Sequence, residues 1–279
     1  MTGKYLLTLD NGNTNPHLGI FRGRKLIAVH HATDKRIITD FINKQKIKNF
    51  EAVISDVGAR NSLIEYLQKK SEVLSLLKIS SLKNNKKKRF LDMPFDYSNS
   101  IGDDRISQSY YVYKKLLTRE RGEWALLIDS GTFTTVDYIS GEKGYLGGYI
   151  FPGPKTFLST YGQGRYLPSL SLNAFTIGDR GVAKRTEDAI LYAVDIYLYS
   201  SMKEVVERFL KEKGKNKNNK KIILTGGFAK LQMKILKSMN IDKIDKIDKI
   251  DKKVDVSIEK HLIHHSMYYI HSVNSEEKK

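Results

Sequence analysis

The sequence contains two segments in which an apolar, strand-forming run leads into an Asp-x-Gly turn. They are KYLLTLDNGNTN (residues 4–15) and WALLIDSGTFTTVDYI (residues 124–139), and their carboxylates are Asp10 and Asp129. Backbone N–H groups and a hydroxyl in such a turn can bind phosphate oxygens, and the carboxylate can hold a metal ion. One such segment alone is more often an ordinary turn, because Asp, Asn and Gly all favour turns.

The repetition of this pattern favours the phosphate site. Each segment is followed by a strand, a glycine-containing turn and another strand, in residues 17–31 and 135–150. Two strand-turn motifs that each open a hairpin predict two related halves that face each other across a cleft. A nucleoside triphosphate could bind there, with one loop at each end of its phosphate chain. Two unrelated hairpins with polar turns are the less favoured alternative.

Composition limits the class of protein. A chain of 279 residues with 40% hydrophobic residues can bury a sizeable core, and we expect two domains. The absence of cysteine excludes disulfides, cysteine-ligated zinc and thiol nucleophiles. There is no apolar run of about 18 residues and no signal-peptide pattern at the start. We therefore expect no membrane span and a cytoplasmic location.

The formal net charge of +17 raises the question of an anionic partner. The excess lysine is concentrated in KNNKKKR (residues 83–89) and KEKGKNKNNKK (residues 211–221). Neither run is interleaved with aromatic residues, as binding of single-stranded nucleic acid would favour. We interpret both as solvated loops and expect no nucleic-acid partner.

Strand and helix patterns alternate along the chain, which predicts an α/β architecture. We place the domains at residues 1–120 and 121–279. Residues 61–77 are expected to form one helix, and residues 241–252, four copies of Ile-Asp-Lys, are expected to be a surface insertion. The terminal segment also has a helical pattern, and its four histidines are expected at the surface or at an interface.

Five motifs together resemble a known family. DNGNTN, IGDDR, DSGTFTTVD, GGYIFPG and LTGG occur in this order within about residues 5–230, and they resemble the bacterial type III pantothenate kinases. The resemblance implies two actin-like (ribonuclease H-like) halves, a homodimer and a cytoplasmic enzyme. It also implies transfer of the ATP γ-phosphate to pantothenate, the first step of coenzyme A synthesis. Such enzymes require a divalent metal such as Mg²⁺ and a monovalent cation, K⁺ or NH4⁺.

The resemblance assigns roles residue by residue. Asp104 matches the proton acceptor, Asp129 the monovalent-cation ligand, and Asp10 the residue that orients Mg²⁺, directly or through water. The expected ATP contacts are Asp10, Asn11, Gly12, Asn13, Thr14, Asn15, Pro16, His17, Thr132, Gly226 and Gly227. The expected pantothenate contacts are Tyr97, Gly102, Asp103, Asp104, Arg105 and Thr186. Phosphoryl transfer needs a positioned hydroxyl, neutralised phosphate charge and a base, and this set would supply them.

Three departures from the family pattern affect these roles. Asp103 stands where a small apolar residue is usual, and its charge is expected to raise the pKa of Asp104 or to repel the carboxylate of pantothenate. The segment from Tyr97 to Gly102 is shorter than usual, which puts the role of Tyr97 in doubt. Phe157 replaces a common serine.

Two other functions are alternatives to an active pantothenate kinase. A non-catalytic relative with a regulatory or binding role would be free to lose Asp10, Asp104 and Asp129, and all three are present. A different kinase or phosphatase of the same fold is also compatible with the architecture. The GDDR and GGYIFPG elements argue against it.

Overall fold

The computed structural model describes residues 5–12, 16–31, 35–56, 62–70, 72–98, 100–118, 122–172, 177–178, 181–211, 220–239 and 254–276. Of the expected ATP contacts, Asn13, Thr14 and Asn15 lie outside the described residues, as does the Ile-Asp-Lys segment 241–252. The chain divides into two compact units. The first comprises Met1–Leu116 with His261–Lys279, and the second comprises Leu117–Lys260.

The first unit is built on a five-stranded sheet with the order β3-β2-β1-β4-β5. Strand β1 pairs antiparallel with β2 and parallel with β4. On the two outer sides, β3 pairs antiparallel with β2, and β5 pairs parallel with β4. The strands are β1 (Tyr5–Asn11), β2 (His17–Arg22), β3 (Lys25–His31), β4 (Phe50–Asp56) and β5 (Val73–Lys78).

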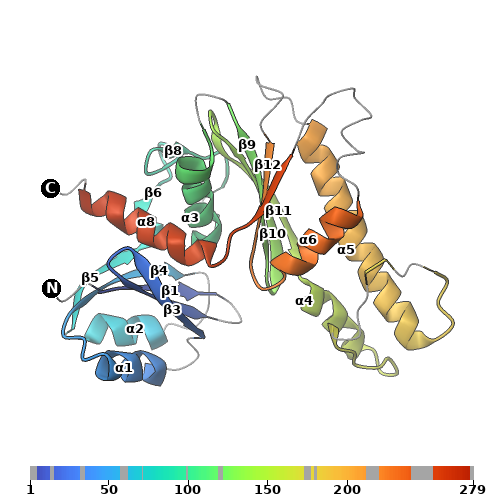
Figure 1. The fold of residues 1–279 in the computed structure, drawn as a ribbon, viewed down its shortest axis with the longest axis horizontal. Coiled ribbons are helices and arrows are strands. Elements are labelled where there is room, and N and C mark those ends of the chain that lie inside the picture. Colours follow the sequence, from blue (N-terminus) through green and yellow to red (C-terminus); the bar gives the residue numbers. More distant parts are fainter. Residues whose placement is uncertain are drawn as a thin grey trace. The chain divides into compact units, whose positions relative to one another are not determined.

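Helices cover both faces of this sheet, because side chains alternate along the central strand. Leu7 and Leu9 pack with buried residues of α1 (Lys35–Lys44) and α2 (Ser62–Lys69). Thr8 points the other way, toward the C-terminal helix α8 (Leu262–Glu276), which also contacts α3 (Asp103–Tyr111). Figure 1 shows α1 and α2 on one side of the first sheet and α8 on the other.

The segment between β5 and α3 forms a separate small sheet. Its strands are β6 (Lys83–Asn84), β7 (Arg89–Phe90) and β8 (Met93–Pro94), preceded by the 3-10 turn η1 (Ile79–Leu82). A π-helical turn, η2 (Val112–Leu116), follows α3. The expected helix over residues 61–77 ends at Lys69, and the remainder forms β5. Pairing of this segment with β4 overrides its local helical pattern.

The second unit repeats the sheet of the first, with the order β11-β10-β9-β12-β13. As in the first unit, the first three strands along the chain pair antiparallel, and the other two pairings are parallel. This match confirms the predicted pair of related halves. The strands are β9 (Trp124–Ser130), β10 (Phe133–Ser140), β11 (Gly144–Pro152), β12 (Lys220–Thr225) and β13 (Asp255–Ile258). Its helices are α4 (Pro154–Ser159), η4 (Thr160–Gln163), α5 (Thr186–Lys211) and α6 (Ala229–Ser238).

Helix α8 belongs to the first unit, although the sequence pattern predicts that residues 121–279 belong to the second. The contact surface of the helix explains this placement. His264 is 1% exposed, its Nδ1 lies 2.8 Å from Thr8 Oγ1, and Phe21 of β2 stacks on Tyr268. The expectation that the terminal histidines lie at the surface or an interface is therefore wrong for His264. Burial and the neighbouring histidines lower the pKa of His264 to about 3, so the ring is neutral near pH 7.

The close approach of α8 to β2 requires a glycine at position 19. A Cβ on Gly19 would lie 2.5 Å from His264 Nδ1 and 2.5 Å from Thr8 Oγ1. Gly19→Ala should therefore lower the free energy of unfolding by about 1–3 kcal/mol, the usual cost of overpacking. Urea denaturation measures this change. Gly181→Ala is the control, because its Cβ would meet no atom within 4 Å, and equal stability of the two variants would contradict the proposed packing.

Candidate active site

The two candidate phosphate loops start at equivalent places in the two sheets. Asp10 is the penultimate residue of β1 and pairs in register with Ser55 on the parallel strand β4. Asp129 is the penultimate residue of β9 and pairs with Thr225 on the parallel strand β12. Each carboxylate therefore lies at the edge of a sheet where two parallel strands end together.

The first loop is anchored by its asparagine. Asn11 Nδ2 donates a hydrogen bond of 2.8 Å to Oδ1 of Asp56, the last residue of β4. Asn11 is buried, so this bond ties the end of β1 to the end of β4. A Cβ added at Gly12 would meet no atom of the described residues within 4 Å, so those residues leave room for a ligand beside its backbone. Pro16 is buried where the loop enters β2.

His17 is the first residue of β2 and pairs in register with Asp10. Its ring centroid lies 4.8 Å from that of His31. Burial, followed by the charges of His31 and His261, lowers the pKa of His17. The ring can therefore exchange hydrogen bonds with a phosphate near pH 7 while adding no positive charge.

The second loop depends on Gly226, which follows β12. Gly226 has φ +84°, and a Cβ there would lie 2.4 Å from Oδ1 of Asp129 and 2.6 Å from the carbonyl oxygen of Ser130. The Phe228 N–H donates to that same carbonyl at 2.9 Å. Gly226 thus leaves the space that the Asp129 carboxylate occupies, whereas a Cβ on the adjacent Gly227 would meet nothing within 4 Å.

The GGYIFPG element fixes the other side of this loop. The Thr132 carbonyl accepts hydrogen bonds from the Gly153 N–H at 2.9 Å and from the Thr156 hydroxyl. A Cβ on Gly153 would lie 2.2 Å from the Gly131 carbonyl oxygen. Phe157, the departure from the family pattern, stacks on Tyr197 with ring centroids 4.1 Å apart.

The expected substrate loop is the N-terminus of α3. Gly102 is extended at φ −62° and ψ 150°, and the helix begins with Asp103 and Asp104 in its first turn. The helix dipole favours acidic residues there. Burial raises the pKa of the Asp104 carboxyl above its ordinary value, while a hydrogen bond from the Arg105 backbone and the Arg105 charge act in the opposite direction. Asp103 raises that pKa only as the smallest of these effects, so burial outweighs the expected contribution of the second carboxylate.

The structure brings Tyr97 to this helix despite the short connecting segment. The Arg105 guanidinium lies over the Tyr97 ring, 5.5 Å from its centroid, and Arg105 is 5% exposed. The Lys88 ammonium group donates to the Tyr97 carbonyl at 2.6 Å. Thr186 belongs to the second unit, where it is the first residue of α5 and is exposed.

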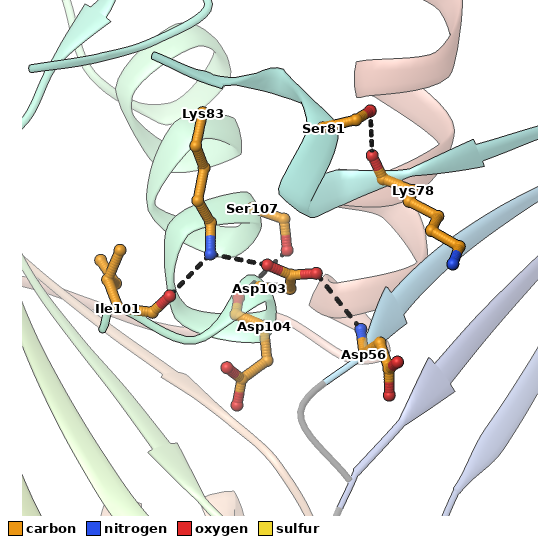
Figure 2. A network of polar contacts seen from close by, with 8 residues as sticks. All are labelled: Asp56, Lys78, Ser81, Lys83, Ile101, Asp103, Asp104 and Ser107. Carbon is orange, nitrogen blue, oxygen red and sulfur yellow. Dashed lines mark hydrogen bonds and ion pairs between the residues drawn. The ribbon is translucent and has the colours of Figure 1, made fainter. Parts of the chain in front are cut away.

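Sequence reasoning missed two residues of this site, Lys83 and Asp56. The expectation that residues 83–89 are a solvated lysine run is wrong for Lys83, because its ammonium group is bonded to Asp103 (Figure 2). The Asp56 backbone N–H donates to the other Asp103 oxygen at 3.4 Å. The available signal was Asp103 itself, because a carboxylate that is buried where a small apolar residue is usual requires a nearby cation.

The described residues contain no group of three or more His, Asp or Glu side chains placed to hold a metal ion. Mg²⁺ commonly binds through one or two carboxylates together with substrate phosphates, and a single Asp10 fits that mode. In the second unit, the Asp129 carboxylate and the Ser130 carbonyl both lie against Gly226, which has no side chain to separate them. These hard oxygen donors suit K⁺ or NH4⁺.

Within the part of the chain that the structure describes, no helix is both long enough and apolar enough to cross a bilayer.

Comparison with known proteins adds family information to this geometry. The family model described as Type III pantothenate kinase matches residues 6–208. The type III pantothenate kinase of Finegoldia magna is 30% identical over 256 residues, which cover 85% of this chain and 91% of that protein. The one from Desulforapulum autotrophicum is 30% identical over 245 residues, covering 81% and 87%.

A solved structure supports the fold. MreB 5 of Spiroplasma citri, bound to AMPPNP, has a TM-score of 0.51, covers 98% of each chain and is 10% identical. At this identity the likeness shows the fold alone. Together with the repeated sheet topology, it confirms the expected actin-like architecture.

Gly226 provides a direct test of the second loop. Gly226→Ala should lower the free energy of unfolding by about 1–3 kcal/mol, because a non-glycine residue is strained at positive φ. It should also displace the Asp129 carboxylate. Gly227→Ala is the matched comparison for stability and should unfold close to the parent. Thermal unfolding of the three proteins measures the difference, and equal losses in both variants would contradict the assigned geometry.

Proposed function

This chain belongs to the type III pantothenate kinase family, and we propose that it transfers the γ-phosphate of ATP to the primary hydroxyl of pantothenate. The products are 4'-phosphopantothenate and ADP, in the first step of coenzyme A synthesis. The observation that carries the proposal is the joint presence of Asp10, Asp129 and Asp104 at defined ends of strands and a helix. We expect the reaction to take place in the cytoplasm.

Asp104 is the proposed general base. It accepts the hydroxyl proton as the substrate oxygen attacks the γ-phosphorus and the bond to ADP breaks. A carboxylate whose pKa is raised by burial is a stronger base than an exposed one, provided that it remains ionised. The neighbouring Arg105 favours ionisation of Asp104, and we assign it to the pantothenate carboxylate. Gly102, Tyr97 and Thr186 remain proposed substrate contacts.

The phosphate loops have the electrostatic roles. We assign Mg²⁺ to Asp10 and a monovalent cation to Asp129, and these ions would neutralise phosphate charge when bound. Asn11, Gly12 and Pro16 keep their proposed roles as ATP contacts, and we assign to His17 a hydrogen bond with phosphate. Thr132, Gly226 and Gly227 shape the second loop. Asn13, Thr14 and Asn15 keep their proposed roles as ATP contacts.

We further propose a homodimer formed through the second unit. Phe133, Tyr149, Ile150 and Ile196, on β10, β11 and α5, are 45%, 39%, 58% and 51% exposed. Strand β11 is also the edge of its sheet. Exposed apolar side chains on an edge strand and a long helix are the surface that a second copy would cover. Light scattering at micromolar concentration tests this assembly, and a monomeric mass would contradict it.

The experiment that tests the function measures ATP-dependent phosphorylation of pantothenate by the purified chain, with and without potassium. Product formation that depends on both substrates is expected. Asp129→Ala should lose activity that additional potassium does not restore. No transfer by the folded parent chain, with Mg²⁺ and potassium present, would overturn the proposal.

Asp104→Asn keeps the size of the side chain and removes the base. Turnover should fall about 10²–10⁴-fold, the usual range for a general base, while the affinity for ATP changes little. Because the base must be deprotonated, activity is lost as pH falls through the pKa of Asp104. The raised pKa places this loss at a higher pH than an ordinary Asp would give. A pH profile of kcat/KM measures it, and a variant with near-parent turnover would remove the assignment.

A further inference from the structure

Lys83 and Asp103 form a buried ion pair beside the proposed base (Figure 2). Lys83 Nζ lies 2.7 Å from Asp103 Oδ1, and the two side chains are only 10% and 4% exposed. The same ammonium group donates to the Ile101 carbonyl at 2.7 Å. One lysine thus bonds to the residues on both sides of Gly102, and it holds the turn that leads into α3.

The second oxygen of Asp103 is also bonded within the protein. It accepts the backbone N–H of Asp56 at 3.4 Å, and the Asp56 carboxylate accepts from Asn11 at 2.8 Å. The Asp103 carboxylate therefore joins α3 to β6 on one side and to the end of β4 on the other. Through Asp56, the same network reaches the first phosphate loop.

Asp103 and Asp104 are adjacent in the chain, but their side chains point in different directions. Figure 2 shows Asp103 between Lys83 and Asp56, whereas the Asp104 carboxylate points away from both. Because the two residues share the first turn of α3, a shift of Asp103 also moves Asp104. The position of Asp104 therefore depends on the contacts of its neighbour.

We propose that Lys83 and Asp103 are a matched pair of positioning residues, which hold the N-terminus of α3 so that Asp104 is presented to the hydroxyl of the substrate. The inference rests on the proposed function, since it takes Asp104 to be the base. It also replaces the expected contact between Asp103 and pantothenate with a role inside the protein.

Electrostatics distinguishes this pair from a simple structural contact. Among the described residues, the charged side chains that act on Asp104 are Arg105, which favours its ionised form, and Asp103, which opposes it. Asp103 is in turn bonded to Lys83 from β6 and lies beside Asp56 from β4. Loss of the lysine alone would leave an uncompensated carboxylate next to the base. Loss of both side chains would remove the Asp103 carboxylate as well, so no uncompensated charge would remain beside Asp104.

A double-mutant cycle tests the pair. The proteins are the parent, Lys83→Met, Asp103→Ala and Lys83→Met/Asp103→Ala, with Lys86→Met as the control for loss of an exposed lysine from the same segment. Two properties are measured: the pH profile of kcat/KM, and the titration of Asp104 by carbon-13 carboxyl NMR without substrate. The signal that disappears in Asp104→Asn identifies the residue.

In Lys83→Met the titration of Asp104 should move to higher pH, because the Asp103 carboxylate then lacks its compensating cation. Between the parent and variant titrations kcat/KM should fall, by as much as roughly tenfold for each pH unit of the measured shift. The double variant should recover the parent titration of Asp104, because no uncompensated carboxylate remains, but its kcat/KM should stay below that of the parent at every pH, because the N-terminus of α3 is no longer held. Lys83→Arg, which keeps the charge, should stay close to the parent. Lys86→Met should leave both measurements unchanged.

Several outcomes would overturn the inference. A Lys83→Met protein with the parent titration and pH profile would show that the pair only stabilises the fold. If Lys83→Met does not fold, the double variant decides. A double variant that folds and keeps the kcat/KM of the parent contradicts the positioning role. A parent that transfers no phosphate overturns the proposed function instead, and the NMR titrations then decide whether Lys83 controls Asp104.

Discussion

The parallel pairing of β1 with β4 and of β9 with β12 determines where chemistry can occur in each unit. Parallel strands end at the same edge of a sheet, so the residues that leave them come together there. Asn11 consequently meets Asp56 in the first unit, and Asp129 meets Gly226 in the second. The N-terminus of α3 is attached to the first of these edges through the Asp56 backbone. The direction of the strands therefore determines where the candidate site residues gather in each unit.

Packing on the opposite face of the first sheet constrains the same region. Thr8 lies between the apolar residues Leu7 and Leu9, and it turns toward α8, where His264 is buried. A histidine whose pKa is lowered to about 3 is neutral in the folded protein, whereas the unfolded chain binds a proton near pH 6.5. Acidification below that value therefore favours unfolding. The helix is held on β1 and β2 by contacts that a charged ring would weaken.

The sequence predicted the parts of the site that are local. Asp10 and Asp129 each stand directly after an apolar run, so strand, turn and carboxylate are visible in one short window. The matching sheet topology of the two halves followed from their repetition. Lys83 was missed because its partner lies in another motif and because its neighbours are exposed lysines. Strand β5 and the attachment of α8 to the first unit were missed for the same reason, since both depend on long-range pairing that no local pattern contains.

Asp103 shows how a departure from a family pattern can be interpreted physically. A carboxylate in place of a small apolar residue is costly at a buried position unless a cation and hydrogen bonds compensate it. Lys83 supplies the cation, and the Asp56 N–H supplies a hydrogen bond. Lys83 is therefore held by its ion pair with Asp103, whereas Lys86 and Lys87 of the same lysine-rich segment are exposed. In this chain the unusual carboxylate of Asp103 is accommodated by contacts from Lys83 and Asp56, two residues that lie outside the five motifs of the family resemblance.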